Sequence, residues 1–182
     1  VTDDAVARAK AIAGGDYVVL VADVWGKGRQ PKDSGEAGKF AGALRGEDRG
    51  PLRARIEAAV ATLKAQAGKA PLDASKIGAF GFCFGGSTVL ELVRSGADVA
   101  GVVSLHGGLA PGAKSQTTAS IKAAVLVLNG ADDKAVPDED IVAFEKEMDA
   151  AKADWQFVDF SGAVHCFAEA SAGNDPASNC RY

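Results

Sequence analysis

The sequence predicts an α/β fold in which helices cover both faces of a mostly parallel sheet, and three observations carry this prediction. Short, unbroken apolar runs rich in valine recur along the chain, as expected of strands that are buried on both faces. The stretches between these runs are long enough for the helical crossovers that parallel strands require. The 182 residues, 47% apolar and 24% charged, suit one domain of ordinary size. We therefore expect a single domain over residues 1–182.

The first part of the chain predicts one helix, one strand and a long excursion. Thr2 can cap a helix that runs to about Ala13, because its hydroxyl can accept a hydrogen bond from a backbone N–H of the first turn. Two acidic residues in that turn also favour the helix. Tyr17–Ala22 is a continuous apolar run and is expected to form the first strand. Residues 23–46 are rich in glycine and lysine and contain few apolar residues, so this stretch is expected to leave the sheet. Its Trp25 is either a pocket wall or a core residue.

Helical and strand patterns alternate through the rest of the chain. Pro51 suits a first helical position, and apolar residues recur at helical spacing from there to Gly68. Further helices are expected over Ser87–Arg94 and from Pro137 onward. The four remaining strands are expected at Ile77–Phe82, Val99–Leu105, Ala123–Leu128 and Trp155–Phe160.

The strand that ends at Phe82 leads directly into a motif with chemical meaning. Gly81-Phe82-Cys83-Phe84-Gly85 has the pattern of a nucleophile elbow, with cysteine in the place that serine usually takes. Such a turn needs small flanking residues and places the nucleophile at a helix N-terminus, whose positive end favours a thiolate. The alternative is a buried structural cysteine in a tight turn between a strand and a helix.

Two further candidate groups follow later strands, at the edge of the sheet where active groups gather. Asp132 and Asp133 come after the fourth expected strand, and His165 comes after the fifth. The resulting order of nucleophile, acid and histidine is the order that belongs with this elbow. His106 follows the third strand and is the alternative base, but it precedes the acid in the chain. We therefore favour Cys83, an aspartate and His165 as a catalytic triad, in which the histidine takes the thiol proton.

Composition excludes several other classes of protein. The net charge of −4 argues against a nucleic-acid partner, and no apolar run is long enough to span a membrane. The chain opens with neither a signal peptide nor a methionine, which indicates that it starts inside a longer protein. Three cysteines without paired spacing predict neither a disulfide framework nor a metal site, so Cys166 and Cys180 are interpreted as structural. We expect a reducing, cytoplasmic setting and no metal or cofactor.

Taken together, these motifs resemble the dienelactone hydrolase family of the α/β-hydrolase fold. The similarity covers nearly the whole chain, and the cysteine elbow followed by two glycines is its most specific marker. The resemblance implies a three-layer sandwich that lacks N-terminal strands and the C-terminal helix, and a domain that is incomplete at both ends. The matching stretches are residues 81–86, 103–107, 129–133 with 136–137, and 162–167.

The resemblance also implies a reaction and assigns roles to residues. In the family, the thiol attacks the carbonyl of a small ester or lactone to give an acyl-thioenzyme, which water then hydrolyses. The family's acid is the last residue of a Gly-x-x-Asp turn four residues before a proline, which points to Asp133, with Asp132 as the runner-up. The backbone N–H of Phe84, the residue after Cys83, would donate to the oxyanion. No cofactor takes part in this chemistry.

Two departures from the family pattern bear on substrate and fold. Glu169 stands where members that act on dienelactone carry an arginine for the substrate carboxylate. No counterpart is found of the strand and loop that supply the family's thiol-pairing glutamate and second oxyanion donor. With that strand missing, Val18–Ala22 and Ile77–Phe82 are expected to lie about 10 Å apart, two strand spacings. The alternative function is a non-catalytic domain that binds ligands or senses thiols.

Overall fold

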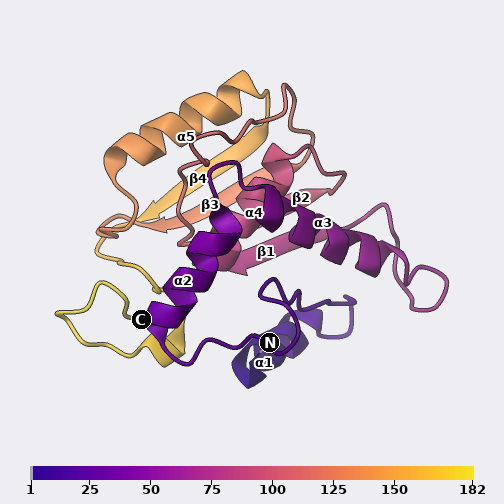
Figure 1. Ribbon diagram of the computed structural model, residues 1–182, viewed down its shortest axis with the longest axis horizontal. Helices are drawn as coiled ribbons and strands as arrows, with labels where there is room; N and C mark the ends of the chain where they lie inside the picture. The colour runs from indigo at the N-terminus through magenta and orange to yellow at the C-terminus, as the bar shows by residue number, and fades with distance from the viewer. Residues whose placement is uncertain (1) are drawn as a thin grey trace.

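A computed structural model describes residues 2–182, and its centre is a parallel sheet of four strands (Figure 1). Each strand pairs with the next one along the chain, so the order across the sheet is the order in the sequence. Parallel neighbours require crossover connections: one helix lies between the first and second strands and another between the third and fourth, and the second strand is joined to the third by a long segment without a helix. The predicted α/β fold is thus confirmed. The strands are β1 (Gly78–Phe82), β2 (Gly101–Leu105), β3 (Ala124–Gly130) and β4 (Asp154–Phe160).

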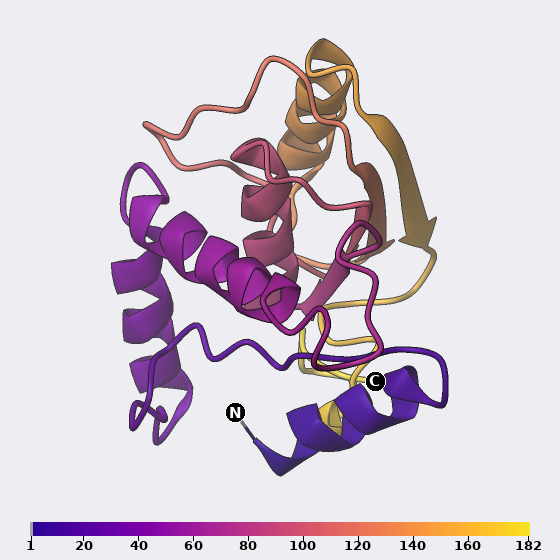
Figure 2. The same ribbon diagram turned by 90° about the vertical axis from the view of Figure 1, so that its right-hand side faces the viewer.

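Five α-helices and one short 3-10 helix are found within residues 2–182, and Figure 2 shows α3 and α4 together on one side of the sheet. The first helix is capped as predicted, because the Thr2 hydroxyl accepts a hydrogen bond from the Ala5 N–H at 3.2 Å. The helices are α1 (Asp3–Ala13), α2 (Ser34–Arg45), α3 (Gly50–Lys64), α4 (Phe84–Arg94), α5 (Asp138–Ala150) and the 3-10 helix η1 (Ala170–Ala172).

The core fills the space between the sheet and helices α3, α4 and α5. Alternate residues of a strand share one face, so Val125 and Val127 of β3 both point into this core. Phe144 and Met148 lie one turn apart on α5 and are buried against the same cluster. Burying each such side chain stabilises the fold by about 1.5–3 kcal/mol. This packing holds the carboxyl ends of all four strands in a fixed arrangement.

The opposite face of the sheet is less covered within the described residues. Phe80 and Val158 are exposed on it, and Phe160 at the end of β4 is 41% exposed. Helix α1 reaches this face near Phe82, whose ring lies 4.8 Å from the Arg8 guanidinium carbon. Helix α1 itself buries no residue completely.

In the first fifty residues, the expected strand is absent, and the stretch expected to leave the sheet does so but contains a helix that was not predicted. Tyr17–Ala22 forms no strand, and Tyr17 is 72% exposed. A strand needs a neighbour for its backbone hydrogen bonds, and within residues 2–182 β1 pairs only with β2. The expected excursion also contains α2, which the Asp33 carboxylate caps by accepting a hydrogen bond from the Glu36 N–H at 2.8 Å. Three glycines lower the helix propensity of α2, so the helix was not predicted from the sequence.

The remaining elements lie close to their predicted positions. Within residues 2–182, none of the helices combines the length and apolar character needed to cross a bilayer.

Candidate active site

Cys83 stands at the turn between β1 and α4, with its side chain exposed. Its φ of +50° is uncommon for a residue with a side chain and costs about 1–3 kcal/mol, which the surrounding structure has to offset. Two hydrogen bonds hold the turn: the Cys83 N–H donates to the Leu105 carbonyl at 3.0 Å, and the Ser87 N–H donates to the Cys83 carbonyl at 3.1 Å. The strained elbow is thereby fixed to the end of β2 and to the first turn of α4.

The two glycines of the elbow motif have different reasons to be there. A Cβ on Gly81 would lie 2.2 Å from the backbone carbon and oxygen of Gly85, closer than any side chain tolerates. The strand and helix can therefore meet only if residue 81 is glycine. Gly85, in contrast, has open space where its own Cβ would lie. The predicted need for a small residue holds at Gly81, and Gly85 contributes the backbone that approaches it.

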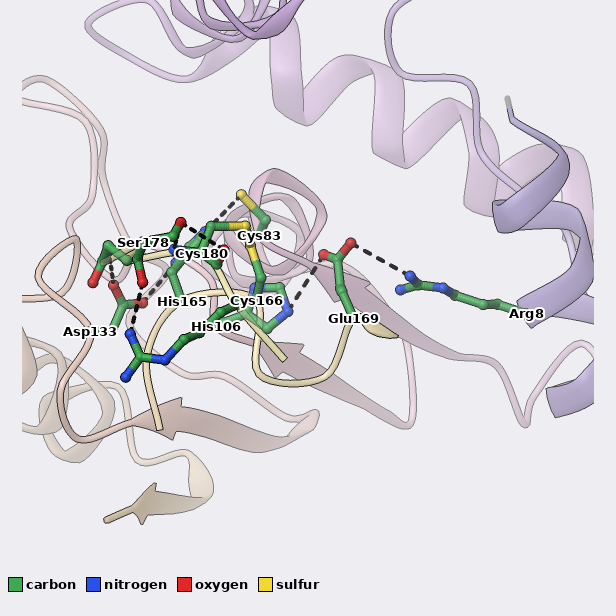
Figure 3. Close-up of a disulfide and its surroundings, with 11 residues drawn as sticks. Arg8, Cys83, His106, Asp133, His165, Cys166, Glu169, Ser178 and Cys180 are labelled. Carbon is green, nitrogen blue, oxygen red and sulfur yellow. Dashed lines mark hydrogen bonds and ion pairs between the residues drawn. A yellow bond between two sulfur atoms is a disulfide. The ribbon is translucent and has the colours of Figure 1, made fainter. Parts of the chain in front are cut away.

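Cys83, His165 and Asp133 form one continuous chain of contacts (Figure 3). His165 Nε2 lies 3.1 Å from Cys83 Sγ, and His165 Nδ1 lies 2.7 Å from Asp133 Oδ2. Asp133 follows β3 and is only 4% exposed, whereas Asp132 is exposed. Of the two candidate acids, Asp133 is therefore the one that contacts the histidine. The three groups converge beyond the carboxyl ends of β1, β3 and β4, as the sequence predicts.

The surroundings of His165 favour its protonated form. The pKa of His165 is raised from 6.5 to about 9, first by its hydrogen bond with Cys83 and then by its hydrogen bond with Asp133, while burial works in the opposite direction. At neutral pH the imidazole of His165 therefore carries a proton on both ring nitrogens and is positively charged. A protonated imidazole beside a sulfur atom is the arrangement that stabilises a thiolate.

His106, the other candidate base, lies next to this triad with a different environment. Its ring is 0% exposed, and its centroid is 5.0 Å from that of His165 in an edge-to-face arrangement. The rings of Phe82 and Phe167 also flank it. Burial, and then the charge on His165, lower the pKa of His106 from 6.5 to about 4. His106 is thus a neutral packing partner of His165 at physiological pH.

The prediction that this chain carries no disulfide is wrong. Cys166 and Cys180 are bonded, with their sulfur atoms 2.06 Å apart, and Cys83 is the free cysteine of residues 2–182. The chain after Cys166 turns back on itself, and the Arg181 N–H donates to the His165 carbonyl at 3.0 Å. This return brings together two cysteines that are 14 residues apart, which spacing alone does not indicate. The cysteine count therefore no longer supports the reducing setting that was inferred from it.

Sequence patterns gave no sign of several neighbours of the site. Glu169 Oε1 lies 3.6 Å from His106 Nε2, and Glu169 Oε2 lies 3.5 Å from an Arg8 guanidinium nitrogen. On the other side of the elbow, the ring of Trp25 stacks on that of Phe84 with centroids 4.8 Å apart. Each pair joins residues that are far apart in the chain, so local motifs could not reveal the contacts. Trp25, left open as core or pocket wall, covers the residue that follows Cys83.

A hollow of about 460 Å³ lies between α1 and the segment around η1. Its wall includes Arg8, Phe82 and Tyr182. Cys83, Asp133 and His165 are not among the residues that line this hollow.

The fold and the elbow together define an α/β hydrolase, since a strand, a sharp nucleophile turn and a helix follow one another at the carboxyl edge of a parallel sheet. Comparison of sequences gives the family: the dienelactone hydrolase family matches residues 2–181, and the chain belongs to it.

Individual relatives agree with this membership. A solved structure of a dienelactone hydrolase-like promiscuous phosphotriesterase from metagenomic libraries shares 36% identity, with a TM-score of 0.87 over all of this chain and 73% of its own. An uncharacterized protein of Caenorhabditis elegans is 36% identical over 70% of this chain and 80% of its own. The human carboxymethylenebutenolidase homolog is 29% identical over 87% of this chain. The match spans 62% of the length of that human relative.

Proposed function

We propose that this protein hydrolyses carboxylic esters or lactones through Cys83, His165 and Asp133. The observation that carries the proposal is the unbroken contact chain from thiol to imidazole to buried carboxylate, with distances of 3.1 and 2.7 Å. Membership of a hydrolase family supports the same reaction class. Each group has the chemical character that its role requires: a free thiol, a histidine that holds a proton, and an acid that orients it.

Acylation starts from the pair in which His165 Nε2 already carries the proton and the Cys83 sulfur is the thiolate nucleophile. The thiolate attacks the carbonyl carbon, and the electron pair of the C=O bond moves to oxygen to give a tetrahedral oxyanion. As the oxyanion collapses, the C–O bond to the leaving group breaks, and His165 Nε2 gives its proton to the departing alkoxide. An alcohol leaves, and the acyl group remains on Cys83 as a thioester.

Deacylation repeats these steps with water as the nucleophile. Neutral His165 takes a proton from water, and the resulting hydroxide adds to the thioester carbonyl. Collapse of the second tetrahedral intermediate breaks the C–S bond, and a carboxylic acid leaves. Cys83 and His165 return to their starting protonation. Asp133 fixes the imidazole orientation and stabilises its positive charge.

The backbone N–H of Phe84 is our candidate donor to the oxyanion. Phe84 is the first residue of α4, and the first N–H groups of a helix have no carbonyl within the helix to bind. The helix N-terminus also favours negative charge near Cys83. Removing one such donor typically slows a reaction by about 10²–10³-fold. The stacked ring of Trp25 limits the freedom of Phe84 and thus helps to fix this donor.

We infer that neutral esters are better substrates than esters with an extra carboxylate. Glu169 lies beside His106, whose ring touches that of His165, so its negative charge is close to the triad. Like charges repel, and the partner Arg8 offsets this charge only in part, at 3.5 Å. A comparison of kcat/KM for phenyl acetate and for a phenyl ester of a dicarboxylic acid tests this, and equal values would contradict it.

The experiment for the main proposal uses 4-nitrophenyl acetate with the wild type, Cys83→Ala and Cys83→Ser. We expect Cys83→Ala to lose nearly all turnover, and mass spectrometry of proteolytic peptides of the wild type to detect an acetyl adduct on the peptide that contains Cys83. Because Cys166 and Cys180 are bonded to each other, adduct formation on a free thiol is specific to Cys83. Equal turnover by wild type and Cys83→Ala would favour the alternative, a non-catalytic binding or thiol-sensing domain.

Phosphotriester hydrolysis is a second candidate activity at the same site. It is favoured by one observation, the 36% identity over the whole chain to a promiscuous phosphotriesterase. Turnover of diethyl 4-nitrophenyl phosphate by the wild type, and its loss in Cys83→Ala, would support it. No turnover above the buffer rate would remove this candidate and leave ester hydrolysis in place.

A further inference from the structure

The carboxyl-terminal segment makes a contact with the triad that the mechanism above does not use. The side-chain amide nitrogen of Asn179 donates to Asp133 Oδ1 at 3.1 Å, and the Asn179 amide oxygen accepts from the Lys134 N–H at 3.1 Å. We propose that Asn179 is a positioning residue for Asp133 and that the Cys166–Cys180 disulfide holds it in place. This inference rests on the proposed function, because it assigns Asn179 to the same triad.

The contact completes the hydrogen bonding of a buried carboxylate. Asp133 Oδ2 faces His165, while Asp133 Oδ1 accepts from the Ala135 N–H at 2.8 Å and from Asn179. The Asp133 side chain is 0% exposed, so water does not replace a missing donor easily. Two donors on Oδ1 fix the plane of the carboxylate, and this plane determines whether Oδ2 points at the imidazole N–H.

The orientation of the Asn179 amide follows from its partners. A backbone N–H can only donate, so the oxygen of the Asn179 amide must face Lys134. The amide NH₂ group then faces Asp133, which as a carboxylate can only accept. An aspartate at residue 179 would keep the first contact and turn the second into repulsion between two carboxylates. Only an amide satisfies both sides at this position.

The disulfide explains how a residue 46 positions away from Asp133 stays there. Asn179 immediately precedes Cys180, which is bonded to Cys166, the residue after His165. The Arg181 N–H donates to the His165 carbonyl, so the segment is attached on both sides of Cys180. One cross-link therefore ties the loop with the histidine to the loop that braces the acid. Without it, the closed loop from 166 to 180 gains conformational freedom and Asn179 leaves Asp133 more often.

Removal of the amide in Asn179→Ala should lower kcat for 4-nitrophenyl acetate by about 10–100-fold, the range seen for residues that orient a functional side chain. KM should change little, because Asn179 does not touch the substrate. Asp133 raises the pKa of His165, so a poorly held Asp133 lets that pKa fall below about 9. The alkaline limb of kcat/KM, where His165 loses its proton, should move to lower pH.

The matched control is Asn174→Ala, which removes the same amide from an exposed position of the same segment. It should retain wild-type kcat and the wild-type pH profile. A double-mutant cycle then tests the disulfide: in the Cys166→Ser/Cys180→Ser background, Asn179→Ala should cost clearly less than in the wild type. Thermal melts of all variants show that the proteins compared are folded.

Three results would overturn the inference. Asn179→Ala could match Asn174→Ala in kcat and pH profile, the His165 pKa measured by NMR could be unchanged in Asn179→Ala, or the Asn179→Ala loss could be equal in both backgrounds. Failure of the proposed function looks different: wild type and Cys83→Ala would then have equal activity. The NMR measurement of His165 does not require turnover, so it tests the positioning role in that case as well.

Discussion

The two histidines of this chain stand at the same edge of one sheet, 5.0 Å apart between ring centroids, yet their pKa values move in opposite directions. The pKa of His165 rises to about 9 because Cys83 and Asp133 bind the two nitrogens of its ring. The pKa of His106 falls to about 4 because its ring is buried among aromatic rings. Its closest acidic neighbour, Glu169, lies 3.6 Å away and also pairs with Arg8.

This comparison shows that position at a strand end does not by itself make a histidine a base. What distinguishes the two is the set of hydrogen-bond partners at each nitrogen, since desolvation lowers the pKa of both. The neutral state of His106 is also useful to its neighbour. A second positive charge at this distance would oppose protonation of His165, so an uncharged His106 favours the imidazolium of the triad.

The largest difference is expected in activity. His165→Ala should lower kcat for 4-nitrophenyl acetate by about 10⁴-fold or more, as loss of the base does in other triads. His106→Phe keeps an aromatic ring against Phe82 and Phe167 and should cost less than about tenfold. Steady-state kinetics on both variants check this. A larger loss in His106→Phe than in His165→Ala would exchange the roles of the two histidines.

The next largest effect on kcat is expected at Asp133, the acid that contacts His165 but not His106. Asp133→Asn removes the charge but keeps the shape, and should lower kcat by about 10³–10⁴-fold, because the amide favours the wrong imidazole tautomer. Asp132→Asn, at the exposed neighbouring residue, should change kcat less than twofold. The measurement is the same ester assay for both variants. Comparable losses in the two would reopen the assignment of the acid.

Stability should depend on pH in opposite ways at the two histidines. The raised pKa of His165 stabilises the fold below pH 6.5, and this contribution is lost as pH rises toward 9. The lowered pKa of His106 costs stability as pH falls from 6.5 toward 4. Each effect is at most about 3 kcal/mol.

Urea unfolding between pH 4 and pH 9.5 measures both limbs of this profile. His106→Phe should flatten the acid limb, and Cys83→Ala should flatten the alkaline limb, because the bond to Cys83 is the main cause of the His165 shift. An acid limb that persists unchanged in His106→Phe would mean that other groups cause it.

The smallest effect is expected from the positive charge of Arg8, which pairs with Glu169 next to His106. Arg8 is the smallest of the causes that lower the pKa of His106, so Arg8→Gln should raise that pKa slightly. His165 should not respond, because Arg8 is not among the causes of its shift. NMR titration of the two imidazoles checks this. A change at His165 and none at His106 would show that Arg8 acts on the triad directly.

Much of the site was predictable because it follows local rules. The strand, the strained turn and the helix around Cys83 leave a readable pattern of glycines, and chain order selected His165 over His106. The choice of Asp133 over Asp132 as the acid required the resemblance to a family, because the two aspartates are adjacent in one turn. These features depend on local patterns and on the order of motifs along the chain.

The features that sequence analysis missed depend on contacts between distant segments. The Cys166–Cys180 bond requires the chain to turn back past His165, which no spacing rule indicates. Tyr17–Ala22 has the composition of a strand, but composition does not provide the neighbouring strand that its backbone needs. Helix α2 contains three glycines and is stabilised by packing on α3 rather than by propensity.

The most direct test of the account is an NMR titration of the two imidazoles in the wild type and in Cys83→Ala, with His106→Phe used for assignment. We expect one histidine to titrate near pH 9 and the other near pH 4 in the wild type. In Cys83→Ala, the high value should fall clearly while the low value stays in place. Two values near 6.5 in the wild type, or a high value that does not respond to loss of Cys83, would contradict the pairing of His165 with the thiol.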